Sequence, residues 1–130
     1  MKSNRYIFLL LLFISINNIS FAQLNNSIKK EMDRFNTLTN LHDSTKSLSV
    51  QMLFKATEGG VRSLQINKDG ILPEHITEVP AILICVTGQV IFEDEKGAKQ
   101  ILKSGEFYRI EPKVKHWVKG LDNSQLLLIK

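Results

Sequence analysis

Two periods of apolar residues divide the chain. From Leu24 to Leu38, apolar residues recur every three or four positions with charged residues between them, which is the spacing of one face of a helix. After Ser47 the period falls to two, and short β-prone runs alternate with glycine-rich or polar turns. The pattern predicts a short amphipathic helix and connector over 23–47, followed by a β domain over 48–130.

The β domain contains eight runs with the alternation typical of strands. They are Leu48–Ala56, Val61–Ile66, Ala81–Val86, Gln89–Phe92, Lys99–Leu102, Phe107–Ile110, Val114–Val118 and Gln125–Ile129. No helical pattern separates these runs, so an all-β sandwich or barrel is favoured over a parallel sheet with crossover helices. We expect the preceding helix to pack its apolar stripe against this barrel.

The first 22 residues have the pattern of a secretory signal peptide. Lys2 and Arg5 precede the apolar run 6–16, and Ala22 supplies a small residue at the expected cleavage position. The run is shorter than the roughly 17 to 25 residues of a membrane-spanning helix. We therefore expect cleavage after Ala22, no membrane association afterwards, and a periplasmic or secreted protein.

Composition limits the function classes. Cleavage after Ala22 leaves 108 of the 130 residues, the size of one domain. It also removes two of the 17 basic side chains, which leaves 15 basic against 13 acidic side chains. The remaining lysines and arginines are scattered along the sequence rather than gathered on one helix face. This is not the charge pattern of a nucleic-acid-binding protein. Cys85 is the single cysteine, so no intramolecular disulfide can form, and its apolar flanks predict a core position.

Two spaced motifs in the β domain carry candidate chemistry. The later motif is a glycine, an acid, a strand, a proline and a histidine: Gly105, Glu106, Ile110, Pro112 and His116. The earlier motif has the spacing Gly70, Pro73, His75, Thr77, Ala81 and Gly88. With these motifs, residues 64–128 resemble the cupin family. The resemblance implies a double-stranded β-helix, or jelly-roll barrel, with a site in the barrel mouth, and commonly a homodimer.

The resemblance also implies that the metal site is incomplete. In a complete cupin the positions of Thr77 and Ala81 hold His and Glu, so two of the four usual ligands are missing here. If the segment is extended, His75, Thr77 and Ala81 face the same way by strand parity. His116 shares its face with Val114 and Val118. Both histidines are therefore predicted to point into the barrel.

Parity places the neighbouring charges outside. Glu74 and Glu78 are predicted to point outward, and the face with Lys113, Lys115 and Lys119 is predicted to be solvated. Trp117 on that same face is expected to cover the edge of the core, with stacking on a carbohydrate or aromatic ligand as the alternative. His42 in the polar connector is expected at the surface rather than as a third ligand beside His75 and His116.

Three functions fit these residues. The first is an exported barrel that binds a small molecule with His75, Thr77 and His116 as polar contacts. The second is a metal-dependent enzyme of isomerase or dioxygenase type, in which His75 and His116 bind a divalent transition metal (Zn, Mn, Fe or Ni) and water or substrate completes the shell. The third is an interaction domain with a filled barrel. No catalytic residue is assigned.

Overall fold

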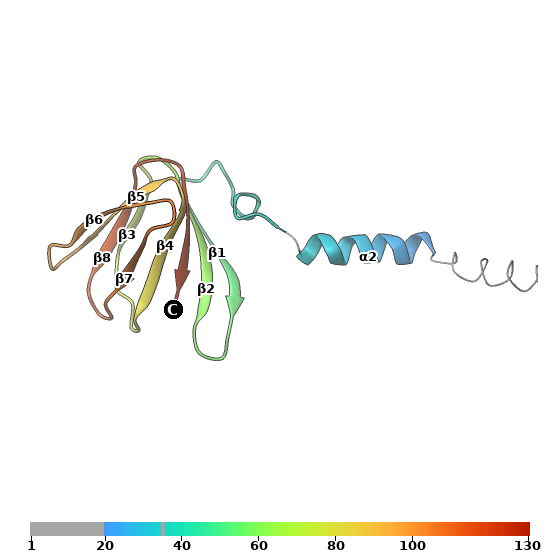
Figure 1. Cartoon of the computed structure of the whole chain (residues 1–130), viewed down its shortest axis with the longest axis horizontal. Coiled ribbons are helices and arrows are strands. Elements are labelled where there is room, and N and C mark those ends of the chain that lie inside the picture. The colour runs from blue at the N-terminus through green and yellow to red at the C-terminus, as the bar shows by residue number, and fades with distance from the viewer. Residues whose placement is uncertain (1–19, 35) are drawn as a thin grey trace, which may run out of the picture. The chain divides into compact units, whose positions relative to one another are not determined.

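The computed structural model describes residues 20–34 and 36–130 (Figure 1). The chain divides into two compact units between Asn36 and Thr37. Of the predicted signal peptide, residues 1–19 lie outside the described residues, as does Phe35 of the predicted helical stripe. In the part of the chain that is described, no helix is both long enough and apolar enough to span a bilayer.

The first unit contains α2 (Phe21–Arg34), which confirms a helix in this region. The helix begins before the predicted cleavage position, and it ends earlier than predicted, because Leu38 lies in a turn before a short 3₁₀ helix, η1 (Thr39–Leu41). Leu24 and Ile28 of its apolar stripe are exposed. The packing of this stripe on the barrel stays a prediction.

The second unit is a sandwich of two antiparallel sheets, as the all-β jelly-roll prediction requires. The five-stranded sheet has the order β1 (Leu48–Lys55), β2 (Gly60–Ile66), β9 (Ser124–Ile129), β4 (Ala81–Thr87) and β7 (Phe107–Ile110). The four-stranded sheet has the order β3 (Ile71–His75), β8 (His116–Gly120), β5 (Gln89–Asp94) and β6 (Lys99–Lys103). Each predicted run corresponds to a strand, with bounds shifted by up to two residues.

Strand β3 was not among the predicted runs. Pro73 argues against a strand, because proline has no N–H to donate to a neighbour. Here β3 is an edge strand, and its pairing with β8 is irregular between Leu72 and His75, where Pro73 falls. An edge and an irregularity are the positions that tolerate proline. Pro73 therefore hid the strand in the sequence, because proline is acceptable in a strand only at an edge or an irregularity of the sheet.

Strand β8 begins two residues later than predicted. Pro112 and Lys113 form a turn, and Lys113 has φ of 61°, so the chain becomes extended only at His116. The alternation is nevertheless as predicted: Val114, His116 and Val118 are buried, whereas Lys115 is exposed.

The core lies between the two sheets and comes from the inward positions of both. Its members, all almost fully buried, are Leu64, Ile66, Ala81, Leu83, Cys85, Val90, Phe92, Leu102, Ile110, Val118, Leu126 and Leu128. The core position predicted for Cys85 is confirmed, and burial, with Glu106 adding a smaller effect, raises the pKa of its thiol. This packed layer supports the residues at one end of the sandwich, where the candidate site lies.

Candidate functional site

Two histidines from neighbouring strands meet at one end of the four-stranded sheet. His75 is the last residue of β3 and His116 the first residue of β8, and the two are register partners. Their ring centroids lie 4.3 Å apart with the ring planes tilted by 59°. Forty residues of sequence separate them, so the pairing of β3 with β8 is what brings the two imidazoles together.

Each imidazole is held by a hydrogen bond of the same kind, to a carbonyl two residues earlier in the chain. His75 Nδ1 lies 2.8 Å from the carbonyl oxygen of Pro73, and His116 Nδ1 lies 2.8 Å from that of Val114. A carbonyl can only accept, so each Nδ1 carries a proton, and in the neutral form of either ring Nε2 is a lone-pair acceptor. Neither Nε2 has a hydrogen-bond partner within residues 20–34 and 36–130. A ligand with a hydroxyl group, or a metal ion, could engage these nitrogens.

The environment of His116 favours the neutral ring. The side chain is 1% exposed and stacks on Phe92, whose ring centroid is 5.5 Å away. Burial lowers the pKa of His116 below its ordinary value, and the charge of His75 adds to this, while the bond to the Val114 carbonyl opposes it. His116 therefore presents an uncharged acceptor at neutral pH.

Thr77 contributes a hydroxyl without a partner. Its side chain is 2% exposed, and Oγ1 makes no hydrogen bond to any described residue. The backbone of Thr77 is fixed, because its carbonyl accepts from the N–H of Lys113 at 2.7 Å. A buried hydroxyl left unpaired costs on the order of 1–3 kcal/mol. Such a group is rarely retained in a core without water or a ligand to bind it.

A cavity opens beside Thr77 at the same end of the sandwich. Its volume is about 390 Å³, and it is lined by Thr77 and neighbours from three segments, namely residues between 52 and 62 in the β1–β2 hairpin, 76–79 after β3, and Lys130 after β9. We call it the mouth cavity. Figure 1 shows the β1–β2 turn and the C-terminus at this end of the barrel.

A glycine allows these segments to approach. Gly59 has φ of 93°, in the left-handed region that favours glycine, and a Cβ there would collide with the main-chain carbonyl of Lys130. The main chains of Gly60 and Lys130 then hydrogen-bond in both directions. The chain end is thus tied to the hairpin that forms one wall of the mouth cavity.

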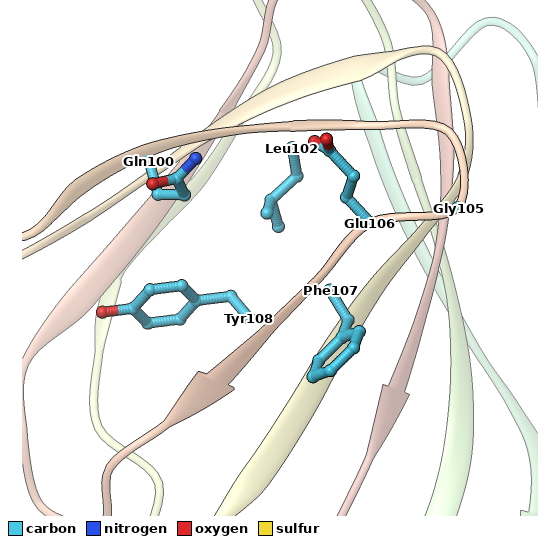
Figure 2. Close-up of a pocket in the computed structure, with 6 residues that line it drawn as sticks. All are labelled: Gln100, Leu102, Gly105, Glu106, Phe107 and Tyr108. Carbon is cyan, nitrogen blue, oxygen red and sulfur yellow. The ribbon is translucent and has the colours of Figure 1, made fainter.

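A second cavity, of about 480 Å³, lies between the edge strands β6 and β7 (Figure 2). Tyr108 lines it and stacks on Phe92 with centroids 4.2 Å apart. Its other polar groups already have partners, since Glu106 Oε2 accepts from the Lys103 N–H and Gln100 Nε2 donates to the Ile101 carbonyl. The mouth cavity, which has the unpaired hydroxyl, is the better candidate for a binding site.

Comparisons with solved structures identify this architecture. A cupin superfamily protein from Desulfitobacterium hafniense superposes with a TM-score of 0.66 at 9% identity, covering 74% of this chain and 87% of that one. An RmlC-like cupin from Shewanella frigidimarina gives 0.60 at 19%, covering 68% and 78%. KdgF from Halomonas sp. gives 0.60 at 18%, covering 68% and 83%. The chain has the cupin fold. No family model and no curated protein matches the sequence.

The donor set at the histidine pair of this cupin-fold chain does not complete a metal site. His75 and His116 offer two nitrogens, Thr77 offers a weak neutral oxygen, and Ala81 is a core residue of β4 with no donor. No group of three or more His, Cys, Asp or Glu able to hold a metal occurs in the described part of the chain. First-row metals are usually held by three or four such donors. Water or a substrate oxygen would have to supply the rest.

The segment after β3 differs from the extended strand considered for it. Residues 76–80 form a loop, and Ala81 starts a strand of the opposite sheet. Thr77 and Ala81 are nevertheless buried, while Glu74 and Glu78 are exposed as predicted. Glu74 pairs with Lys115 Nζ at 3.1 Å on the outside of the barrel. Neither carboxylate therefore completes the histidine pair.

Trp117 and its neighbouring lysines lie on the solvent-facing side of β8. The indole Nε1 donates to Glu93 at 2.9 Å, and the ring is half-buried, in line with the prediction that it covers an edge of the core. Lys113 and Lys115 are exposed, and Lys119 is half-buried and pairs with Asp69 at 3.4 Å. Lys115 and Lys119 on this face therefore already form ion pairs with neighbouring acidic side chains at the surface.

The prediction that His42 lies at the surface was wrong. Its side chain is only 9% exposed, with Nδ1 2.9 Å from Ser49 Oγ and Nε2 2.8 Å from Ser63 Oγ. The connector after η1 folds over the outward face of β1 and β2, where these serines lie. Burial lowers the pKa of His42. With both nitrogens occupied, His42 is not a third ligand for the histidine pair.

Proposed function

We propose that this cupin is exported and binds a small molecule at its barrel mouth, with His75, Thr77 and His116 as polar contacts. The observation that carries the proposal is the joint lack of partners on three inward groups: the two Nε2 atoms and Thr77 Oγ1. A mostly apolar concavity with a few placed polar groups is the usual form of a small-ligand site.

Equilibrium dialysis tests this proposal. The purified protein is dialysed against a small-molecule extract of a bacterial culture, and enriched compounds are identified by mass spectrometry. We expect at least one compound to be enriched by the wild type and not by His116→Ala or Thr77→Val. Ser49→Ala, which changes the His42 region instead, is the matched control and should retain the compound. Failure of the wild type to enrich any compound would contradict the proposal.

A metal-dependent enzyme is the second candidate. It is favoured by one observation, the Nδ1–H to carbonyl bonds of both histidines, because metal-binding imidazoles usually donate the other ring N–H in this way. Elemental analysis after purification without chelators, with Zn, Mn, Fe and Ni offered separately, tests it. Stoichiometric metal that His116→Ala removes would favour the enzyme, whereas a protein that takes up none of the four would end this candidate.

Export is proposed from residues 1–22. Expression in a bacterial host followed by intact-mass analysis should give a periplasmic or secreted species that begins at Gln23. A species that keeps Met1 to Ala22 and stays in the cytoplasm would contradict this part of the proposal.

We also propose a homodimer. Strand β1 is an edge of the five-stranded sheet, and Val50, Leu53 and Phe54 on it are exposed. An unpaired apolar edge is a surface that a second chain can cover. Light scattering should give twice the monomer mass, and Phe54→Lys should give the monomer. A monomeric wild type would contradict this part.

A further inference from the structure

The mouth cavity is rich in positive charge that has no ion-pair partner among the described residues. Lys55, Arg62 and Lys130 line it, against a single acidic side chain, Glu78. The ion pairs found in residues 20–34 and 36–130 involve four other lysines and none of these three cations. Unpaired cations that converge on one concavity raise the local concentration of anions.

Strand register explains why Arg62 reaches the cavity. Arg62 precedes Leu64 and Ile66 on the same face of β2, and both of these are core residues. Its register partners are Met52 in β1 and Leu128 in β9. Arg62 therefore continues the inward row of β2 to the point where the apolar core ends. It is half-buried, which strengthens its electrostatic interactions relative to those of a fully solvated arginine.

Part of the lining of the mouth cavity is apolar. Met52, Ile76 and Val79 contribute to it, and each is about half exposed, at 48%, 47% and 50%. Inorganic phosphate or sulfate would use the cations and leave this apolar surface in water. An anion with an apolar body would cover it, at a gain of about 25 cal/mol for each Å² of apolar surface buried.

We propose that the mouth cavity binds a small organic carboxylate, with Arg62, Lys55 and Lys130 around the carboxylate group and the apolar lining around the rest of the molecule. The proposal rests on the proposed function, because Thr77, whose buried Oγ1 has no partner among the described residues, is both a proposed ligand contact and a lining residue of this cavity. The cavity volume of about 390 Å³ lies in the range of small-ligand pockets.

The cavity and the histidine pair are electrostatically linked. The charge of Lys130 contributes, as the smallest of several effects, to the lowered pKa of His116. A carboxylate bound to Lys130 would offset this charge. The imidazole NMR signals of His116 are therefore expected to shift when the anion binds, and they report binding without any measurement of activity.

Hexanoate and hexan-1-ol form a matched pair of probes for the purified full chain, since they share an apolar body and differ in charge. In ¹H–¹⁵N NMR titrations, hexanoate should bind and shift the backbone amide signals of residues 76–79. Hexan-1-ol should bind at least about tenfold more weakly, because it lacks the charge, and one charged hydrogen bond contributes about this ratio of affinities. Inorganic phosphate is the third probe and should be weaker than hexanoate. Equal binding of hexanoate and hexan-1-ol would overturn the inference.

Charge-removing variants locate the site. Lys55→Gln and Arg62→Gln should each weaken hexanoate binding, by about tenfold for Arg62→Gln, while Lys68→Gln, which removes an exposed charge outside the cavity lining, should change it by less than about twofold. Glu78→Gln should strengthen binding, because it removes the one acidic side chain of the lining. Equal weakening by Lys68→Gln would show a net-charge effect and overturn the site.

The two proposals fail in different ways. If dialysis enriches a neutral compound that requires His116 and Thr77, and hexanoate does not bind, the barrel is a binding module for a neutral ligand and the carboxylate inference is overturned. If hexanoate binds and loses affinity in Arg62→Gln, but shifts no signal of His75 or His116 and is insensitive to Thr77→Val, the anion site stands and the histidine-based proposal fails.

Discussion

The barrel holds histidine in two contrasting environments. His42 is buried between Ser49 and Ser63, and each ring nitrogen has a hydroxyl partner. His116 is buried and His75 is half-buried beside it, and each uses only Nδ1, in a bond to a carbonyl two residues earlier. Burial lowers the pKa of both His42 and His116, so burial and pKa alone do not separate the two environments.

The number of open hydrogen-bonding positions does separate them. The hydroxyls of Ser49 and Ser63 satisfy both ring nitrogens of His42, and these bonds hold the connector on the outer face of the sheet. His75, His116 and Thr77 each keep a hydrogen-bonding position without a partner in the described part of the chain, and Thr77 also lines the mouth cavity. A closed set of hydrogen bonds indicates a structural role, and an open set beside a cavity indicates a binding role.

The largest expected effect on the free energy of unfolding comes from removing the hydrogen bonds of His42. His42→Ala removes a buried ring and leaves the hydroxyls of Ser49 and Ser63 without their partner, so it should lower the free energy of unfolding by about 2–4 kcal/mol. Urea unfolding at pH 8 measures this. Hexanoate affinity, measured under conditions where the variant is folded, should stay within about twofold. A loss below about 1 kcal/mol would show that the His42 interactions are not structural.

The next effect distinguishes paired from unpaired hydroxyls. Thr77→Val removes a buried hydroxyl with no partner, so the free energy of unfolding should rise by about 1 kcal/mol. Ser63→Ala is the control, because its hydroxyl pairs with His42, and it should lower the same quantity by about 1 kcal/mol. Both are measured by urea unfolding without added ligand. A Thr77→Val protein less stable than the wild type would mean that Oγ1 is satisfied in solution.

The smallest effect is that of pH. The folded-state pKa values of His42 and His116 lie below the ordinary value of 6.5, so below that pH the unfolded chain binds more protons than the folded one. The free energy of unfolding should keep its full value above pH 6.5, and it should decrease as the pH falls from 6.5 toward the folded-state pKa values of these two histidines. Urea unfolding between pH 8 and pH 5 measures the decline.

Imidazole ¹⁵N NMR at pH 8 separates the two environments in the same pH series. His75 and His116 should both show the Nδ1–H tautomer, because their Nδ1 atoms face carbonyls. An Nε2–H tautomer at either residue would contradict the open acceptor positions from which the binding site is argued.

Local patterns in the sequence were enough to predict the strands and the inward faces. Alternation of period two located eight of the nine strands that the structure describes. Strand parity also predicted correctly that the side chain of His116 points inward and that those of Glu74 and Glu78 point outward. These features depend on residues adjacent in sequence, and the pleat of a strand repeats every two residues whatever lies around it. The cupin fold was indicated by a resemblance to that family, carried by the motifs around His75 and His116.

Tertiary structure alone decided the features that depend on distant segments. His42 was expected in solvent because its neighbours are polar, yet the outward serines of β1 and β2 bury it. Strand β3 exists because an edge position tolerates Pro73. The mouth cavity joins Lys55 and Arg62 of the β1–β2 hairpin to Lys130 after β9. No local pattern encodes such meetings, because they follow from the order and register in which the strands pair.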